Sequence, residues 1–206
     1  MKVYFVRHGE TTYNASNVFQ PLDASLSELG LKQAKFVAER FTSIPIDVIL
    51  SSPLLRTQQT ANEINKTLNK GIVWIDELKE FRRPTEFINK NPSSKEVSDV
   101  KKLFKENQHD SNWHYSDEEN FFDVKKRALK LIEIINSRSE KNILAVTHGE
   151  FLRMVIGVMY LGENITVDEY AKLQKFLKTI NTGITVVVKE DDKWKLLTWN
   201  DHAHLG

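Results

Sequence analysis

Short apolar runs recur along the chain, separated by longer segments in which apolar and polar residues alternate irregularly. The runs are rich in valine and isoleucine, which is typical of strands buried on both faces of a sheet. They predict strands at residues 2–6, 46–50, 72–75, 143–147, 184–188 and 194–198.

Several of the segments between these runs repeat apolar residues at helical spacing. Ser27 is placed to cap the first predicted helix. Ser52 followed by Pro53 predicts the start of the second, because proline is favoured at the first helical position. Two further helices are predicted at residues 123–137 and 150–161. Strands that alternate with helices predict a three-layer α/β/α sandwich with a mostly parallel central sheet.

Residues 81–120 interrupt this alternation. The stretch is polar, contains Pro84 and Pro92, and has only a weakly amphipathic piece at 97–104. We interpret it as a polar insertion that caps the strand ends, and we expect residues 1–206 to form a single domain.

Composition narrows the classes of function. The chain has 206 residues, 40% of them hydrophobic, which is enough for a core. A net charge of +1 gives no electrostatic case for nucleic acid or membrane partners. The absence of cysteine excludes disulfides, a cysteine nucleophile and a thiolate zinc site. Neither a signal peptide nor a membrane-spanning run is visible, so we expect a cytoplasmic protein.

Two histidine-glycine pairs follow predicted strands. His8-Gly9 comes after the first strand, and His148-Gly149 comes after the strand at 143–147. Ligands of open α/β sheets bind outside the carboxyl ends of the strands. A histidine after a strand is more often structural than catalytic, but the repeated pattern favours a shared site.

Arginines are expected near both histidines. Arg7 precedes His8, and Arg56 lies one turn into the helix predicted after the strand at 46–50. Guanidinium groups bind phosphate oxygens in pairs, and nearby cations favour the neutral, nucleophilic form of an imidazole. The sequence therefore predicts phosphoryl transfer through a histidine, with His148 donating to the phosphate.

The motifs that carry these residues resemble those of a known family. They read Arg7-His8-Gly9-Glu10-Thr11 with Asn14, Leu26-Ser27-Glu28-Leu29-Gly30 with Gln33-Ala34, residues 51–61, Val146-Thr147-His148-Gly149, Asn181-Thr182-Gly183, and the tail at 200–205. In this order they resemble the histidine phosphatase superfamily, also called the phosphoglycerate mutase-like family, over nearly the whole chain.

The resemblance implies a role for each matching residue. His8 would be the phosphorylated nucleophile, and Glu80 would be the proton donor. From the sequence alone, a solvated loop carboxylate is an equally good interpretation of Glu80. The phosphate pocket would consist of Arg7, Arg56 and His148. Further candidate substrate contacts are Asn14, Gln20 and Gly149.

The chain departs from the family pattern near the expected pocket. Pro21 replaces the usual glycine, so a backbone N–H contact to phosphate would be lost there. The segment after Glu80 lacks the glycine and tryptophan common in the family. One hypothesis is that Arg82 and Arg83 bind a second anionic group of the substrate. The alternative is that they face solvent or pair with Glu80 or Glu86.

These patterns predict a phosphoric monoester hydrolase of the histidine acid phosphatase type, acting on a small phosphorylated metabolite through a phosphohistidine. No cofactor or metal is expected, because two arginines and a histidine supply the positive charge, and His202 with His204 is a weak metal pair. The missing Tyr-Tyr-Gly segment favours a phosphatase over a phosphoglycerate mutase. Two alternatives remain: a phosphoglycerate mutase, and a catalytically weak protein that binds a phosphorylated ligand. The substrate and the oligomeric state, including a homodimer, stay open.

Overall fold

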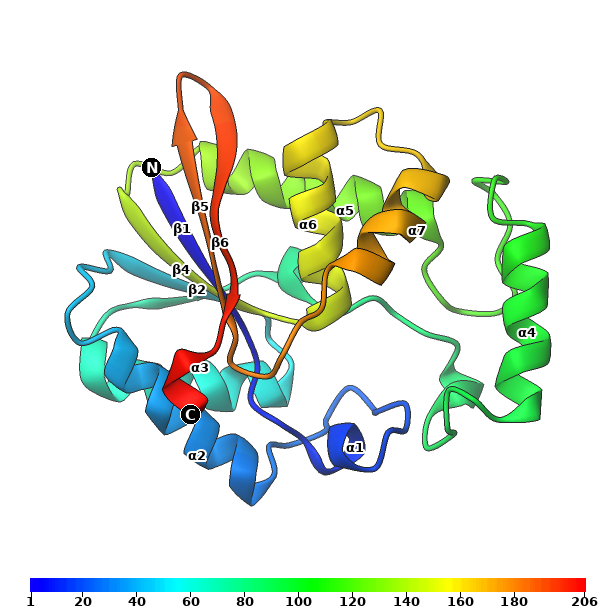
Figure 1. Ribbon diagram of the computed structural model, residues 1–206, viewed down its shortest axis with the longest axis horizontal. Helices are drawn as coiled ribbons and strands as arrows, with labels where there is room; N and C mark the ends of the chain where they lie inside the picture. The colour runs from blue at the N-terminus through cyan, green and yellow to red at the C-terminus, as the bar shows by residue number, and fades with distance from the viewer.

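A six-stranded sheet forms the centre of the molecule (Figure 1). The computed structural model describes residues 1–206. The strands are β1 (Lys2–Arg7), β2 (Val48–Ser51), β3 (Ile72–Trp74), β4 (Asn142–Thr147), β5 (Ile184–Glu190) and β6 (Lys193–Asp201), in the spatial order β3-β2-β4-β1-β5-β6. The first four pair in parallel, whereas β5 is antiparallel to both β1 and β6. The predicted, mostly parallel sheet is confirmed.

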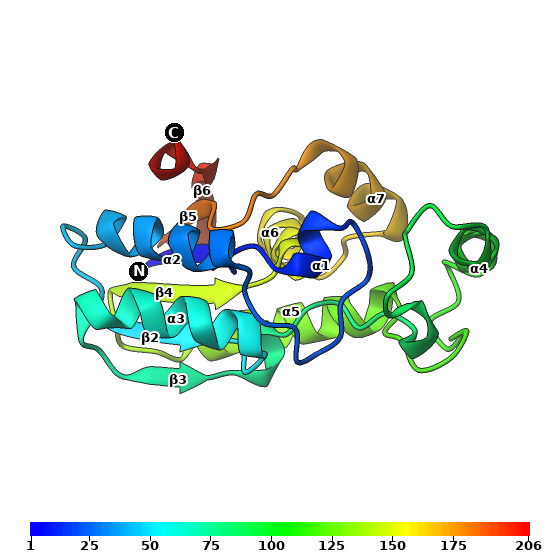
Figure 2. The same ribbon diagram turned by 90° about the horizontal axis from the view of Figure 1, so that it is seen from below.

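Helices cover both faces of this sheet. One face carries α2 (Glu28–Arg40) and α3 (Leu55–Leu68), and the other carries α5 (Phe121–Asn136) and α6 (Gly149–Leu161) (Figures 1 and 2). Side chains of β1 alternate between the two layers: Val3 and Phe5 join the core under α5 and α6, whereas Tyr4 and Val6 join the core under α2 and α3. This is the expected three-layer sandwich.

Three helices complete the fold. They are α1 (Thr12–Ala15), α4 (Lys95–Glu106) and α7 (Val167–Phe176), with short 3₁₀ turns at Asp76–Leu78, Thr85–Phe87 and Ala203–Leu205. The sequence did not predict α1 or α7. α1 buries no residue and α7 buries only Tyr170, so neither carries a clear apolar stripe. None of the helices combines the length and the hydrophobicity that crossing a bilayer requires.

Two predicted helix starts are wrong. α3 begins at Leu55 with Leu54 as its N-cap, so Ser52 and Pro53 precede the helix. α5 begins at Phe121, where the Asn120 side chain accepts hydrogen bonds from the first turn. The acidic segment 117–119 precedes this cap, and its carboxylates bind other parts of the chain.

The segment 81–120 lies beyond the carboxyl ends of the parallel strands, with α4 as its outermost element (Figure 1). Phe104 of α4 packs against Phe87 and Trp113. The segment is tied to the loop after α1 by backbone hydrogen bonds between Phe19 and Asn89 and between Phe19 and Lys90. It therefore forms one wall of the space above the strand ends.

Candidate active site

His8 and His148 leave neighbouring strands at the same edge of the sheet. β1 and β4 are parallel, and Arg7 stands in register with Thr147, so the residue after each is a histidine. The two imidazole centroids are 5.1 Å apart. Both side chains are almost fully buried, at 1% and 0% exposure. The structure thus brings together the two histidines that the sequence singled out.

The His8 ring is held in one tautomer. Its Nδ1 lies 2.7 Å from the carbonyl oxygen of Gly9. Because a carbonyl only accepts, Nδ1 carries the proton and Nε2 keeps its lone pair. The backbone around the ring is also fixed: Asn181 donates to the His8 carbonyl at 2.9 Å, and the Gly9 N–H donates to Thr60 Oγ1 at 3.1 Å. The arrangement leaves Nε2 as the nucleophilic atom.

Burial and positive charge keep both imidazoles neutral. The pKa of His8 lies well below its usual value of 6.5, first because the ring is buried and then because Arg56 and Arg7 are close. The pKa of His148 is lowered well below 6.5 by burial, followed by Arg56, the charge on His8 and Arg7. At neutral pH the site therefore combines neutral imidazoles with cationic guanidinium groups.

Arg56 and Arg7 present donors beside the histidines. Arg56, only 2% exposed, donates from Nη1 to the carbonyls of Pro21 and Leu22 at 3.4 Å each. Arg7 donates from Nη1 to the Thr179 carbonyl at 3.0 Å. Burial lowers the pKa of Arg56 to about 10, so the group stays cationic at neutral pH. The Nε atoms of both arginines are buried without a protein acceptor, and an oxyanion can accept from such donors.

Ser52 orients His148, a role that the sequence did not predict. Ser52 Oγ lies 2.9 Å from Nε2 of His148, and the Nδ1 atom of the same ring is buried without a partner. When the serine hydroxyl donates to Nε2, Nδ1 carries the ring proton and can donate to an anion. The signal was the position of Ser52 at the end of β2, which neighbours β4 in the sheet.

Glu80 lies at the amino end of α6. Its carboxylate accepts from the backbone N–H groups of Phe81 and Phe151 at 2.9 Å each, and from that of Glu150 at 3.3 Å. Glu80 lines the same cavity as Arg7 and Arg56. A carboxylate at this place also interacts favourably with the α6 dipole. Glu80 is therefore an oriented group of the site rather than a solvated loop residue.

Arg127 of α5 holds the segment that carries Glu80. It donates to the carbonyls of Glu77, Lys79 and Glu80 at 2.9, 2.6 and 3.3 Å, and its fork binds the Glu119 carboxylate at 2.7 and 2.8 Å. The guanidinium also lies 4.2 Å from the Phe151 ring centroid. Sequence reasoning missed Arg127, because an arginine on the polar side of a helix usually faces solvent.

Arg7, Arg56 and Glu80 line a cavity of about 520 Å³. Asn14 and Gln20 both line it. The Asn14 amide oxygen accepts from Thr11 and Asn181, each at 3.3 Å, and the Gln20 amide oxygen accepts from Thr11 at 2.9 Å. Their oxygens are thus occupied, which leaves the amide N–H groups as the atoms that can reach a ligand.

Glycines allow close backbone contacts around His8. A Cβ at Gly9 would lie 2.5 Å from the Gly30 carbonyl oxygen, and a Cβ at Gly30 would overlap the Glu10 carbonyl. Gly9 is therefore required by the close approach of the α2 backbone. A Cβ at Gly149 would lie 2.8 Å from Thr179 Oγ1 and 3.2 Å from Arg7 Nε, so this glycine makes room for Arg7.

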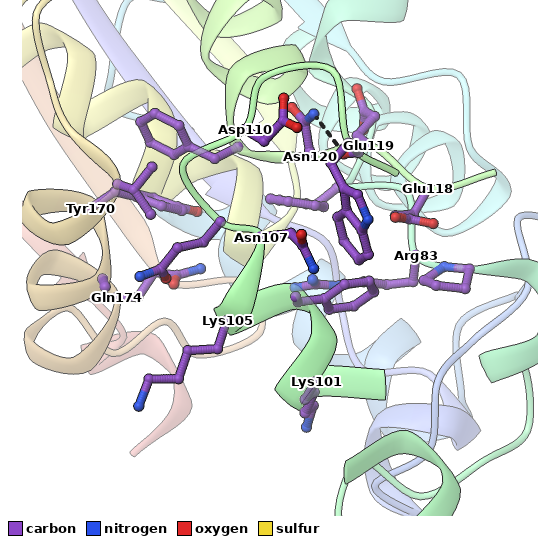
Figure 3. A pocket seen from close by; sticks show the side chains of 18 residues that line it. Arg83, Lys101, Lys105, Asn107, Asp110, Glu118, Glu119, Asn120, Tyr170 and Gln174 are labelled. Atoms are coloured by element: carbon purple, nitrogen blue, oxygen red, sulfur yellow. Dashed lines mark hydrogen bonds between the residues drawn. The ribbon is translucent and has the colours of Figure 1, made fainter. Parts of the chain in front are cut away.

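Arg82 and Arg83 both line the cavity but differ in their surroundings. Arg82 is exposed and forms no ion pair. Arg83 pairs with Glu150, rather than with Glu80 or Glu86, and stacks 4.3 Å from the Phe81 centroid. Figure 3 shows that Arg83 also reaches a second cavity of about 300 Å³, between the inserted segment and α7.

The carboxy-terminal histidines lie apart from this chemistry. His204 Nε2 is 3.0 Å from Thr182 Oγ1, and His202 Nδ1 is 2.8 Å from the Asn200 carbonyl. No group of three or more histidine, cysteine, aspartate or glutamate side chains is arranged to hold a metal ion.

Comparisons with known proteins match almost the whole chain. Residues 3–202 match the family model described as histidine phosphatase superfamily, branch 1. A metal-independent phosphoserine phosphatase of Arabidopsis thaliana is 30% identical over 210 residues, which is 100% of this chain and 83% of that protein. A probable phosphoglycerate mutase of Yersinia pestis is 43% identical over 82 residues, which is only 39% of this chain and 38% of that protein.

A solved structure shares the fold. It is a mutant phosphoserine phosphatase from Entamoeba histolytica in complex with phosphoserine, with a TM-score of 0.80 and 25% sequence identity. The alignment covers 99% of this chain and 98% of that one.

Proposed function

Because the chain belongs to the histidine phosphatase superfamily, we propose that it is a metal-independent phosphomonoesterase that works through a phosphohistidine on His8. The observation that carries the proposal is the tautomer of His8: Nδ1 is bound to a carbonyl, and Nε2 is a free nucleophile next to two arginines. Phosphatase relatives that span the whole chain support hydrolysis over phosphoryl transfer to a second substrate.

In the first step, His8 Nε2 attacks phosphorus in line with the leaving oxygen. The N–P bond forms as the P–O bond to the alcohol breaks, and Glu80 gives its proton to the departing oxygen. Arg7, Arg56 and His148 donate to the phosphoryl oxygens, where negative charge must be stabilised. Asn14 and Gln20 donate from their amide nitrogens at the edge of the phosphate.

In the second step, water attacks phosphorus and the N–P bond breaks. Glu80, now ionised, takes the proton from the attacking water. Inorganic phosphate leaves, and His8 returns to its neutral form with Nδ1 protonated. The donors that hold Glu80 in the cavity wall keep it within reach of both oxygens.

The substrate that we propose is a small phosphomonoester with a charged alcohol. Relatives named as phosphoserine phosphatases direct attention to amino acid phosphates. The cavity holds charges of both signs beyond the phosphate-binding groups, which suits a small polar alcohol. A cytoplasmic location and a homodimer stay predictions from the sequence.

Hydrolysis of p-nitrophenyl phosphate in EDTA tests the proposal directly. We expect turnover by the wild type and none by His8→Ala, because the nucleophile is lost. Brief incubation with a phosphate ester labelled at phosphorus should trap an acid-labile, base-stable label on the wild type only. His109→Ala, an exposed histidine outside the cavity, is the matched control and should behave as the wild type.

Three outcomes would contradict the proposal. Turnover that survives in His8→Ala would exclude His8 as the nucleophile. A well-folded wild type that forms no phosphoenzyme with any donor would favour the non-catalytic binding protein. Turnover that appears only as phosphoryl transfer between phosphoglycerates would favour the mutase.

A further inference from the structure

An ion pair of opposite charges lies on the wall of the proposed active-site cavity. Arg83 comes from the start of the inserted segment, and Glu150 from the first turn of α6. Both side chains line the cavity and keep about a third of their surface exposed, at 33% and 35%. The pair is therefore accessible to a ligand, unlike a buried structural salt bridge.

The pair lies next to the proton donor. The Glu150 N–H donates to Glu80 Oε2 at 3.3 Å, and Arg83 follows Glu80 by three residues. Glu80 must protonate the alcohol oxygen, so the groups beside it face the alcohol rather than the phosphate. Arg7 and Arg56 define the phosphate side. The alcohol part of a bound substrate thus meets Arg83 and Glu150.

Both members of the pair are held in place by other contacts. The Arg83 guanidinium stacks 4.3 Å from the Phe81 centroid, and Arg153 lies 3.8 Å from Glu150 Oε1. The other Glu150 oxygen, Oε2, is the one that pairs with Arg83. Phe81 and Arg153 therefore keep the two side chains in place when a ligand separates them, but neither replaces the close ion pair.

We propose that Arg83 and Glu150 together recognise a zwitterionic alcohol, one that carries both a carboxylate and an ammonium group. The carboxylate takes the guanidinium fork of Arg83, and the ammonium takes the carboxylate of Glu150. This inference rests on the proposed phosphatase function and names the residues that select its substrate. Binding a zwitterion replaces the Arg83–Glu150 pair with two ion pairs, one to each residue. A singly charged alcohol can form only one of them.

Selectivity follows from the charges left unmatched. An alcohol with a carboxylate alone separates Glu150 from Arg83 and offers Glu150 nothing in return. An alcohol with an ammonium alone likewise separates Arg83 from Glu150 and offers Arg83 no replacement partner. Sites built to bond a group reject analogues that lack it. Because the pair is partly exposed to water, we expect a preference of about tenfold rather than the larger discrimination of a fully buried site.

Four phosphate esters of primary alcohols test this proposal in EDTA. O-Phosphoserine carries both charges, 3-phosphoglycerate only the carboxylate, O-phosphoethanolamine only the ammonium, and glycerol 3-phosphate neither. Each kcat/KM is divided by the value for glycerol 3-phosphate, so that changes in chemistry cancel. We expect the wild type to prefer phosphoserine to each singly charged ester by about tenfold.

Variants separate the two charges. Glu150→Gln should lower the ratio for phosphoserine and phosphoethanolamine and leave the ratio for phosphoglycerate unchanged or higher. Arg83→Gln should lower the ratio for phosphoserine and phosphoglycerate but not for phosphoethanolamine. Arg138 and Glu140 form a pair remote from the cavity, at 2.5 Å and with similar exposure of 22% and 25%. Arg138→Gln and Glu140→Gln are therefore the matched controls, and they should change no ratio.

The possible failures are distinct. Equal losses on all four esters in both variants would make the pair a structural link between α6 and the inserted segment, and would overturn the proposal. A wild type without preference among the esters would overturn it even if neither variant folds. Failure of the phosphatase function itself would appear separately, as loss of EDTA-resistant hydrolysis of p-nitrophenyl phosphate by the wild type.

Discussion

The protonation of His8 is set by its surroundings, and this has a consequence for stability. In the unfolded chain a histidine titrates near its usual pKa of 6.5, whereas the folded chain holds the pKa of His8 and of His148 well below that value. As the pH falls below about 6.5, the unfolded state binds protons that the folded state does not. The free energy of unfolding must therefore decrease as the pH decreases through this window.

We expect replacement of both histidines to weaken this pH dependence. Each contributes a slope of up to about 1.4 kcal/mol per pH unit between pH 6.5 and its folded pKa. Urea unfolding of the wild type and of His8→Asn/His148→Asn, at about pH 7.5, 6.5 and 5.5, measures the difference. The exposed control His109→Asn should keep the wild-type slope. Identical slopes for the wild type and the double variant would show that the folded site accepts protons as readily as the unfolded chain.

At the scale of secondary structure, α5 supports the site through Arg127. Its guanidinium binds three carbonyl groups of the Glu77–Glu80 backbone and the Glu119 carboxylate. Glu119 in turn accepts from the Arg82 N–H at 2.9 Å. A helix on one face of the sheet thus fixes a loop at the sheet's edge, and with it Glu80, the proposed proton donor.

We expect Arg127→Met to lower turnover of alkyl phosphates by about tenfold or more. The kcat/KM for p-nitrophenyl phosphate should change much less, because kcat/KM reports only the transfer to His8 and p-nitrophenolate leaves without a proton. Glu80→Gln should give the same division between the two classes, measured as kcat/KM on each. Lys126→Met, at an exposed position on the same helix, is the control. An equal loss on both classes of ester would show that Arg127 acts through general stability and not through Glu80.

The elements differ in how well the sequence predicted them. The strands carry apolar runs that nothing else explains, so the sequence placed both histidines, Arg7 and Arg56 at one edge of the sheet in advance. α1 and α7 are held by capping boxes and bury little apolar surface, so hydrophobic periodicity could not reveal them. Ser52 matched a helix cap, but its position in the sheet gave it a different partner.

The sequence also could not predict interactions between residues that are far apart along the chain. Arg127 and Glu80 are 47 positions apart, and Arg83 and Glu150 are 67 apart. Local patterns cannot pair such residues, because the pairing depends on how loops pack above the strand ends. The sequence offered a substrate contact for Arg83 only as one hypothesis, and only the fold brought Glu150 to it.

At the scale of the whole molecule, the question is whether residues 81–120 unfold with the rest of the chain. The segment is anchored to α5 by the Glu119–Arg127 pair, at 2.7 Å. Within the segment, Asp117 binds Thr85. The Arg127 and Phe19 contacts link it to elements on both sides of the cavity. These links favour one cooperative unit.

We expect a single unfolding transition for all probes. Tryptophan reports each part separately: Trp113 lies in the inserted segment, whereas Trp194 and Trp199 lie on β6 and Trp74 on β3. A variant with Trp74, Trp194 and Trp199 changed to Phe leaves Trp113 as the fluorescent probe of the insertion. Its urea midpoint by fluorescence should equal the midpoint by far-ultraviolet circular dichroism. An earlier fluorescence midpoint would make the insertion a separate domain.

The contact between Gly9 and Gly30 also limits how this chain can evolve. A methyl group at either position meets backbone rather than a flexible side chain, so no compensating side-chain change elsewhere can make room for it. Both positions therefore have to stay glycine as the sequence diverges, although only Gly9 adjoins His8, the proposed nucleophile. The start of α2, where Gly30 lies, thereby tolerates substitution no better than Gly9 does. A library of random variants selected for activity should be depleted of every substitution at both glycines.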